Sequence, residues 1–80
     1  MCRSIHTLYN IEPPVNQGEI RAAALQYVRK ISGYRKPSKV NEQAFEAAVD
    51  EIEATSARLL ATLETNAPAR ARSMLVSSRI

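Results

Sequence analysis

Residues 41–65, NEQAFEAAVDEIEATSARLLATLET, decide the fold to which the rest of the chain must adapt. Apolar side chains recur in this stretch at steps of four and three residues, with Ser56 filling one gap: Phe45, Val49, Ile52, Leu59 and Leu63. This spacing places them along one side of an α-helix. We therefore predict a long amphipathic helix over residues 41–65, against which the shorter segments pack.

The chain has 80 residues, which is enough for one small domain over residues 1–80. It contains no Trp, one Phe and three Tyr, so its core must be built from aliphatic side chains and alanine. Such a core is thin, which favours regular helix packing or association with another chain. Glycine occurs only twice, and this favours helix over sheet.

A second helix is predicted over residues 17–32, ahead of the long one. Asn16 stands at the capping position and Glu19 follows three residues later, a pattern typical of a capping box. Gly33 suits the left-handed conformation that ends many helices. Its predicted apolar side consists of Ile20, Ala24, Tyr27, Val28 and Ile31, and Arg21, Gln26 and Arg29 are expected to point away from that side.

The two predicted helices are joined by residues 33–40, where Pro37 prevents the first helix from continuing. Asn41 stands at the start of the long helix, so we expect its side chain to cap that helix and Val40 to pack against Phe45. A connection of this length favours antiparallel packing of the two helices.

The two ends of the chain complete the predicted fold. Residues 1–14 are expected to form an N-terminal arm, a short turn plus an extended piece, whose apolar side chains plug the core. In residues 66–80, Pro68 either opens a short third helix, with Met74 and Leu75 facing inward, or begins a basic tail. The predicted fold class is all-α: this arm, the antiparallel helical hairpin, and a short third helix or basic tail.

The net charge of +3 hides an uneven distribution of charged residues. Residues 1–39 carry seven Lys/Arg against two Asp/Glu, residues 40–65 carry one against six, and residues 66–80 carry three against none. The segment charges are therefore +5, −5 and +3. The simplest interpretation is that the basic segments fold against the acidic helix, which weakens any inference of nucleic-acid binding from net charge.

One candidate binding site is a basic cluster at the end of the first helix and in the loop after it. Its members are Arg29, Lys30, Tyr34, Arg35, Lys36 and Lys39. The cations suit phosphate groups and the tyrosine ring suits stacking on a base, so the cluster is a candidate nucleic-acid or anion site. The alternative is a solvated loop whose cations pair with Glu42, Glu46 and the rest of the acidic helix.

A second candidate site consists of Cys2 and His6, which are the only cysteine and histidine in the chain. They are four residues apart, so they share one face if the arm is helical. A structural zinc site needs four ligands, so a metal site built on this pair requires a second chain. The alternative is a small buried thiol and an exposed imidazole.

No grouping of residues in the sequence is typical of a catalytic site. Glu46, Asp50 and Glu53 share a helix face, which we place opposite the apolar side, and exposed carboxylates need no catalytic explanation. The first ten residues do not resemble a signal peptide, and no apolar run approaches the roughly 20 residues that span a bilayer. We expect a soluble cytoplasmic protein that is not an enzyme, with no cofactor and no membrane contact.

Several segments together resemble a known family: the opening MCRSI, the PP pair, EIRAAALQYVRKISG, KPSKVNEQAFEAAVDEI and TNAPARAR. The chain is similar to the small bacterial proteins known as domain of unknown function 2277, over most of its length, with residues 71–80 the least typical. The resemblance implies bacterial origin, a helical domain that stands alone and no established activity. It transfers no catalytic residue to this sequence.

Three functions follow from these patterns. The leading one is a non-enzymatic interaction module, a homodimer or a domain that docks onto another protein. The long helix extends roughly two turns beyond the first, so part of its apolar side needs a cover. The alternatives are nucleic-acid binding through residues 29–39, and a small metal- or thiol-dependent enzyme using Cys2 and His6.

Overall fold

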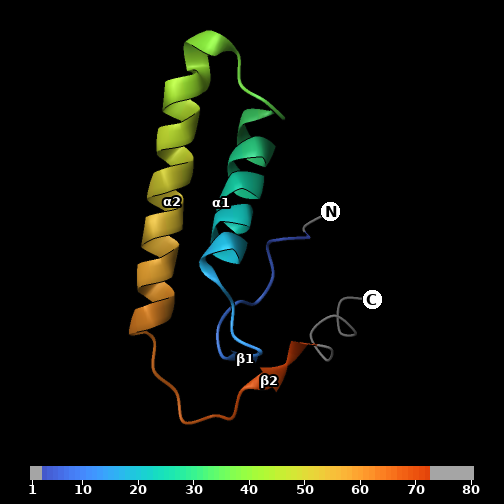
Figure 1. Cartoon of the computed structure of the whole chain (residues 1–80), viewed down its shortest axis with the longest axis vertical. Coiled ribbons are helices and arrows are strands. Elements are labelled where there is room, and N and C mark those ends of the chain that lie inside the picture. The colour runs from blue at the N-terminus through green and yellow to red at the C-terminus, as the bar shows by residue number, and fades with distance from the viewer. Residues whose placement is uncertain (1–2, 73–80) are drawn as a thin grey trace.

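The computed structural model describes residues 3–72 and shows two antiparallel helices side by side, with a two-stranded sheet at one end (Figure 1). In chain order the elements are β1 (Ile11–Glu12), α1 (Gln17–Ser32), the 3-10 turn η1 (Lys39–Asn41), α2 (Glu42–Thr62) and β2 (Arg70–Ala71). The helical hairpin confirms the predicted architecture at this level. The sheet was not predicted, so the fold is mostly helical and not strictly all-α.

α1 begins and ends where the sequence predicts, because local contacts fix both ends. The Asn16 side chain accepts a hydrogen bond from the Glu19 N–H (2.9 Å), and the Glu19 carboxylate accepts one from the Asn16 N–H (3.0 Å), which completes the capping box. At the other end, Gly33 has a φ of 80° and donates its N–H to the Arg29 carbonyl (2.9 Å). Glycine adopts this left-handed conformation without steric cost.

α2 begins without the side-chain cap that we predicted. Asn41 precedes the helix but makes no capping hydrogen bond, because its amide donates to Ser38 Oγ (3.0 Å) and Tyr34 Oη (3.3 Å). The predicted packing of Val40 against Phe45 is also wrong, since Val40 is 88% exposed while Phe45 is buried. The turn η1, and not a capping side chain, leads into α2.

The two asparagines make a matched pair for mutagenesis. We expect N16A to lower the free energy of unfolding by about 1 kcal/mol, because it removes a cap that satisfies a helical N–H group. N41A should lower it much less, since Asn41 caps nothing. Urea unfolding followed by circular dichroism measures both values, and equal losses would contradict this difference between the helix starts.

The core lies between the two helices and is extended by the arm. Its buried side chains are Ile20, Ala24 and Val28 from α1, Phe45 and Val49 from α2, and Ile11 from β1. The burial of Ile11 confirms that the arm contributes to the core. Tyr27 and Ile31 were predicted to belong to the apolar side of α1, but they are exposed.

α2 ends at Thr62, earlier than the predicted Thr65. Leu63 has an extended backbone, and its N–H donates the last helical hydrogen bond to the Leu59 carbonyl (3.1 Å). The side chains of Leu59 and Leu63 are exposed, because α1 has 16 residues against the 21 of α2 and leaves this end uncovered. The apolar side of α2 is thus fully buried only in its first half, and its uncovered end is the part that was expected to need a cover.

After α2 the chain returns to the N-terminal arm and pairs with it. β1 and β2 run parallel, with Ile11 opposite Arg70. A strand at this position shows that Pro68 does not open a third helix. The predicted inward-facing residues Met74 and Leu75 lie outside the described residues.

Asn10 anchors this return. Its backbone is left-handed (φ 56°), a conformation that asparagine tolerates, and its carbonyl accepts a hydrogen bond from the Arg70 N–H (3.0 Å). Its side-chain amide donates to the carbonyls of Ala67 (3.1 Å) and Pro68 (3.3 Å). One asparagine therefore holds the segment that leads into β2.

Candidate anion-binding groove

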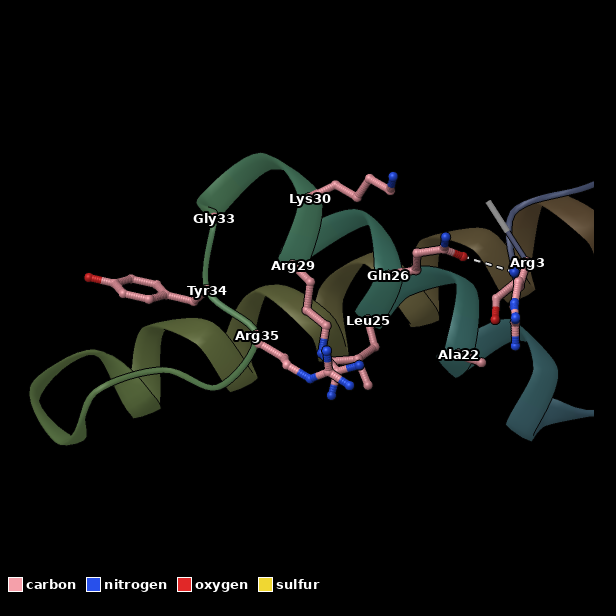
Figure 2. Close-up of a pocket in the computed structure, with 10 residues that line it drawn as sticks. Arg3, Ala22, Leu25, Gln26, Arg29, Lys30, Gly33, Tyr34 and Arg35 are labelled. Atoms are coloured by element: carbon pink, nitrogen blue, oxygen red, sulfur yellow. Dashed lines mark hydrogen bonds between the residues drawn. The ribbon is translucent and has the colours of Figure 1, made fainter. Parts of the chain in front are cut away.

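A groove of about 680 Å³ runs along α1 between the N-terminal arm and the loop that follows the helix (Figure 2). Its lining residues are Arg3, Ser4, Ala22, Leu25, Gln26, Arg29, Lys30, Gly33, Tyr34 and Arg35. Four of them are cationic, and none is Asp or Glu. We refer to the four cations, Arg3, Arg29, Lys30 and Arg35, as the groove cations.

Two groove cations approach the same part of the groove. Arg29 projects from the last turn of α1, and the left-handed turn at Gly33 redirects the chain that carries Arg35. In Figure 2, Arg29 and Arg35 point toward one region beside Leu25, whereas Lys30 points away from it. Guanidinium groups that share a groove repel each other, and a phosphate between them accepts hydrogen bonds from both and removes that repulsion.

Arg3 reaches the groove from the N-terminal arm, at the end opposite Arg35 (Figure 2). The Ser4 N–H donates to Oε1 of Gln26 (2.8 Å), and this partly buried hydrogen bond holds the arm against α1. Arg3 was not predicted to belong to the site, because it is far from Arg29 in the chain and the arm has no periodic pattern. Its positive charge was the only available signal.

The predicted basic cluster is divided by the structure. Arg29, Lys30 and Arg35 line the groove, whereas Lys36 and Lys39 do not. Tyr34 contributes to the lining, but its ring points away from the two arginines (Figure 2), and its hydroxyl accepts a hydrogen bond from Asn41 (3.3 Å).

Of the two carboxylates named as partners of the basic cluster, Glu46 pairs with another residue, and Glu42 joins no ion pair within residues 3–72. Arg21 of α1 donates to Glu46 (3.2 Å), Asp50 (2.8 Å) and Glu53 (2.7 Å) of α2. Within residues 3–72, no ion pair joins a groove cation to a carboxylate. Basic and acidic segments do meet, as predicted, but through Arg21, so the groove cations remain uncompensated.

The position of Arg21 corrects two predictions. We expected Arg21 to point away from the helix interface and the three carboxylates to lie opposite the apolar side. Both groups instead flank the interface, because the long arginine side chain reaches across to α2. Gln17 also donates to Glu53 (2.6 Å), and with Arg21 it lowers the pKa of that carboxyl, while hydrogen bonds to Asp50 and Glu53 raise the pKa of Arg21.

A second ion pair fastens the residue that follows β2 to α1. The guanidinium of Arg72 donates to both carboxylate oxygens of Glu19, each at 2.7 Å, and its Nε donates to the Pro13 carbonyl (2.7 Å). These hydrogen bonds from Arg72, with that from the Asn16 N–H, lower the pKa of Glu19 from its ordinary 4.5 to about 2. Glu19 therefore supports both the capping box and the attachment of β2.

The low pKa of Glu19 predicts a loss of stability in acid. A carboxyl with a lower pKa in the folded chain stabilises it fully above pH 4.5, and this contribution is lost as pH falls from 4.5 toward 2. We expect the melting temperature to fall less steeply for E19Q than for the natural chain over this range. E51Q, which removes an exposed carboxylate outside the described ion pairs, should retain the natural slope; identical slopes for E19Q and E51Q would contradict the assignment.

The structure places one member of the second candidate site. Cys2 lies outside the described residues. His6 is exposed, and its Nδ1 is 3.0 Å from the Thr7 carbonyl oxygen. Over residues 3–72, no group of three or more His, Cys, Asp and Glu side chains is arranged to hold a metal ion. In the same range, neither helix has the length and apolar character needed to cross a bilayer.

The geometry defines the class of this protein as a small helical hairpin with a basic groove along its first helix. A family model described as an uncharacterized conserved protein (DUF2277) matches residues 1–78, and the chain belongs to this family. This confirms the resemblance seen in the sequence. The comparisons with curated proteins and with solved structures gave no match.

Proposed function

We propose that this protein is a non-enzymatic nucleic-acid-binding module that holds phosphate groups in the groove along α1. The observation that supports the proposal best is the charge of this groove. Among the described residues, four cations and no carboxylate line it, while three acids of α2 are paired with Arg21. The alternative of a loop neutralised by the acidic helix is less well supported, because Glu46 pairs with Arg21 and no described ion pair joins the acidic helix to a groove cation.

The chemistry of the lining favours a single strand of RNA or DNA. Three of the four groove cations are arginines, whose planar guanidinium groups bind phosphate oxygens in pairs. Ala22 and Leu25 give the groove an apolar part, and both are only partly buried. A single strand offers phosphates together with exposed base faces, whereas the bases of a duplex are stacked inside. Such a ligand fits the bacterial cytoplasmic location expected from the sequence.

A purely structural role explains only part of the charge. Arg29 and Lys30 lie in the last turn of α1, where positive side chains stabilise the carbonyl end of a helix. Arg3 and Arg35 lie outside α1, so this effect does not account for them. Four cations that line one groove from the arm, the helix and the loop are better explained by an anionic ligand.

Fluorescence polarisation with a labelled single-stranded RNA of about 12 nucleotides tests the proposal. If the four groove cations each neutralise a phosphate, the slope of log K against log salt should be about −3, so that affinity falls roughly 50-fold between about 50 and 200 mM salt. Unlabelled DNA of the same sequence should compete with the RNA.

A duplex of equal length serves as the comparison and should bind more weakly than the single strand. No binding of either oligonucleotide in low salt would overturn the proposal. The proposal would also be wrong if the protein bound acidic peptides or anionic vesicles but no oligonucleotide, because its ligand would then be another class of anion.

A further inference from the structure

The hairpin is a single layer of structure with two broad faces. The molecule measures 46 by 29 by 16 Å, so one dimension is much shorter than the other two. Domains are generally built from at least two packed layers around one core. In the described chain the arm runs beside α1 and not across the hairpin, which leaves both broad faces open (Figure 1).

One broad face is charged. Arg21 of α1 and its partners Glu46, Asp50 and Glu53 of α2 lie on it, since their ion pairs cross from one helix to the other. On each helix the charged residues lie to one side of a row of buried residues. This row includes Ala24 on α1 and Val49 on α2.

The opposite face is apolar. Successive residues turn by about 100° around a helix axis, which puts Tyr27 and Ile31 of α1 on the flank of the buried row opposite Arg21. By the same geometry, Ile52 and Leu59 of α2 lie on the side of the buried row opposite Asp50. Because the helices are antiparallel, these two flanks belong to the same broad face. Tyr27, Ile31 and Leu59 are 46%, 66% and 55% exposed.

The shape of this face suits a second copy of the same chain. α2 is about 32 Å long and two helices side by side are about 20 Å wide, so their common face of roughly 640 Å² approaches the roughly 800 Å² that each partner buries in a standard interface. The small side chains of Ala23 and Ala48 lie on the same flanks and permit close approach of facing helices. Two hairpins stacked about a twofold axis form a four-helix arrangement, which supplies the second layer.

We infer that the apolar face formed by Tyr27, Ile31, Ile52 and Leu59 binds a second copy of this chain. The inference does not depend on nucleic-acid binding. The groove lies along α1 beside the arm, so a dimer joined through the apolar face keeps two grooves accessible. Two grooves in one particle would raise the affinity for strands long enough to reach both.

Sedimentation equilibrium over about 1 to 500 µM protein tests the inference. We expect the mass to rise from 8.9 kDa toward twice that value as concentration increases. The double variant I31E/L59E should remain at 8.9 kDa with unchanged helix content, because both side chains are exposed in the single chain. V40E is the matched control, since Val40 is still more exposed but lies in η1, and it should associate like the natural chain.

A second measurement does not rely on any variant. In a mixture of isotope-labelled and unlabelled chains, intermolecular nuclear Overhauser effects should join the Tyr27 ring to the Ile52 or Leu59 methyl groups. A single-chain mass throughout the concentration range would overturn the inference. So would a dimer that I31E/L59E leaves intact, or intermolecular contacts confined to other surfaces.

Discussion

The double variant R29E/R35E is expected to bind single-stranded RNA at least about 100-fold more weakly than the natural chain. Hydrogen bonds to charged groups contribute about 1.5–3 kcal/mol each, and this variant removes two guanidinium groups that point toward the same part of the groove. The new carboxylates also repel phosphate. Fluorescence polarisation at constant salt measures the loss.

The control for this variant must change the net charge equally without touching the groove. R58E/R70E meets this condition, because Arg58 of α2 and Arg70 of β2 are exposed and do not line the groove. We expect its affinity to fall only several-fold, through the weaker overall field of the protein. Equal losses in the two double variants would show that net charge, and not the groove, attracts the oligonucleotide.

The largest expected effect on stability is that of Phe45→Ala. Phe45 is the only phenylalanine and is buried in the cluster of Ala24, Val28 and Val49 between the helices. Removing a buried phenylalanine side chain typically costs about 3–5 kcal/mol, which approaches the whole stability of a domain of this size. We expect F45A to be largely unfolded at room temperature, as urea titration followed by circular dichroism would show.

Val40→Ala is the control for the phenylalanine variant. The sequence pattern pairs Val40 with Phe45, but Val40 is 88% exposed in the structure. We expect V40A to change the free energy of unfolding by less than about 0.5 kcal/mol. A loss below about 1 kcal/mol for F45A, or a comparable loss for V40A, would contradict the assigned core.

The parts of the fold that were predicted correctly depend on signals that are local in the sequence. α1 is an example, because Asn16, Glu19 and Gly33 set its ends through contacts within a few residues. The start of α2 was mispredicted for the same kind of reason. Asn41 has the residue type of a cap, but Ser38 and Tyr34 compete for its side chain, and no pattern in the sequence decides that competition.

Contacts between distant segments could not be predicted. The strands β1 and β2 have two residues each, which is too short to show an alternating pattern. Asn10 binds Ala67, which is 57 residues further along the chain, so its role depends on where the chain returns after α2. The ion pair between Arg72 and Glu19 depends on the same return.

The groove was predicted only in part, for a related reason. Arg29, Lys30 and Arg35 are close in sequence, so their clustering was visible. Arg3 joins them through the tertiary contact between Ser4 and Gln26. The ion pairs between Arg21 and the acidic helix were missed because helical periodicity gives the direction of a side chain but not how far a long one reaches.

The most direct test of the groove as a nucleic-acid site is an NMR titration of the labelled chain with single-stranded RNA in low salt. Backbone amide signals should shift along the groove, at Arg3, Ser4, Arg29, Gly33 and Arg35, and should change little in β2 and on the acidic flank of α2. Shifts concentrated on those other surfaces, or no shifts at saturating RNA, would contradict the proposed function.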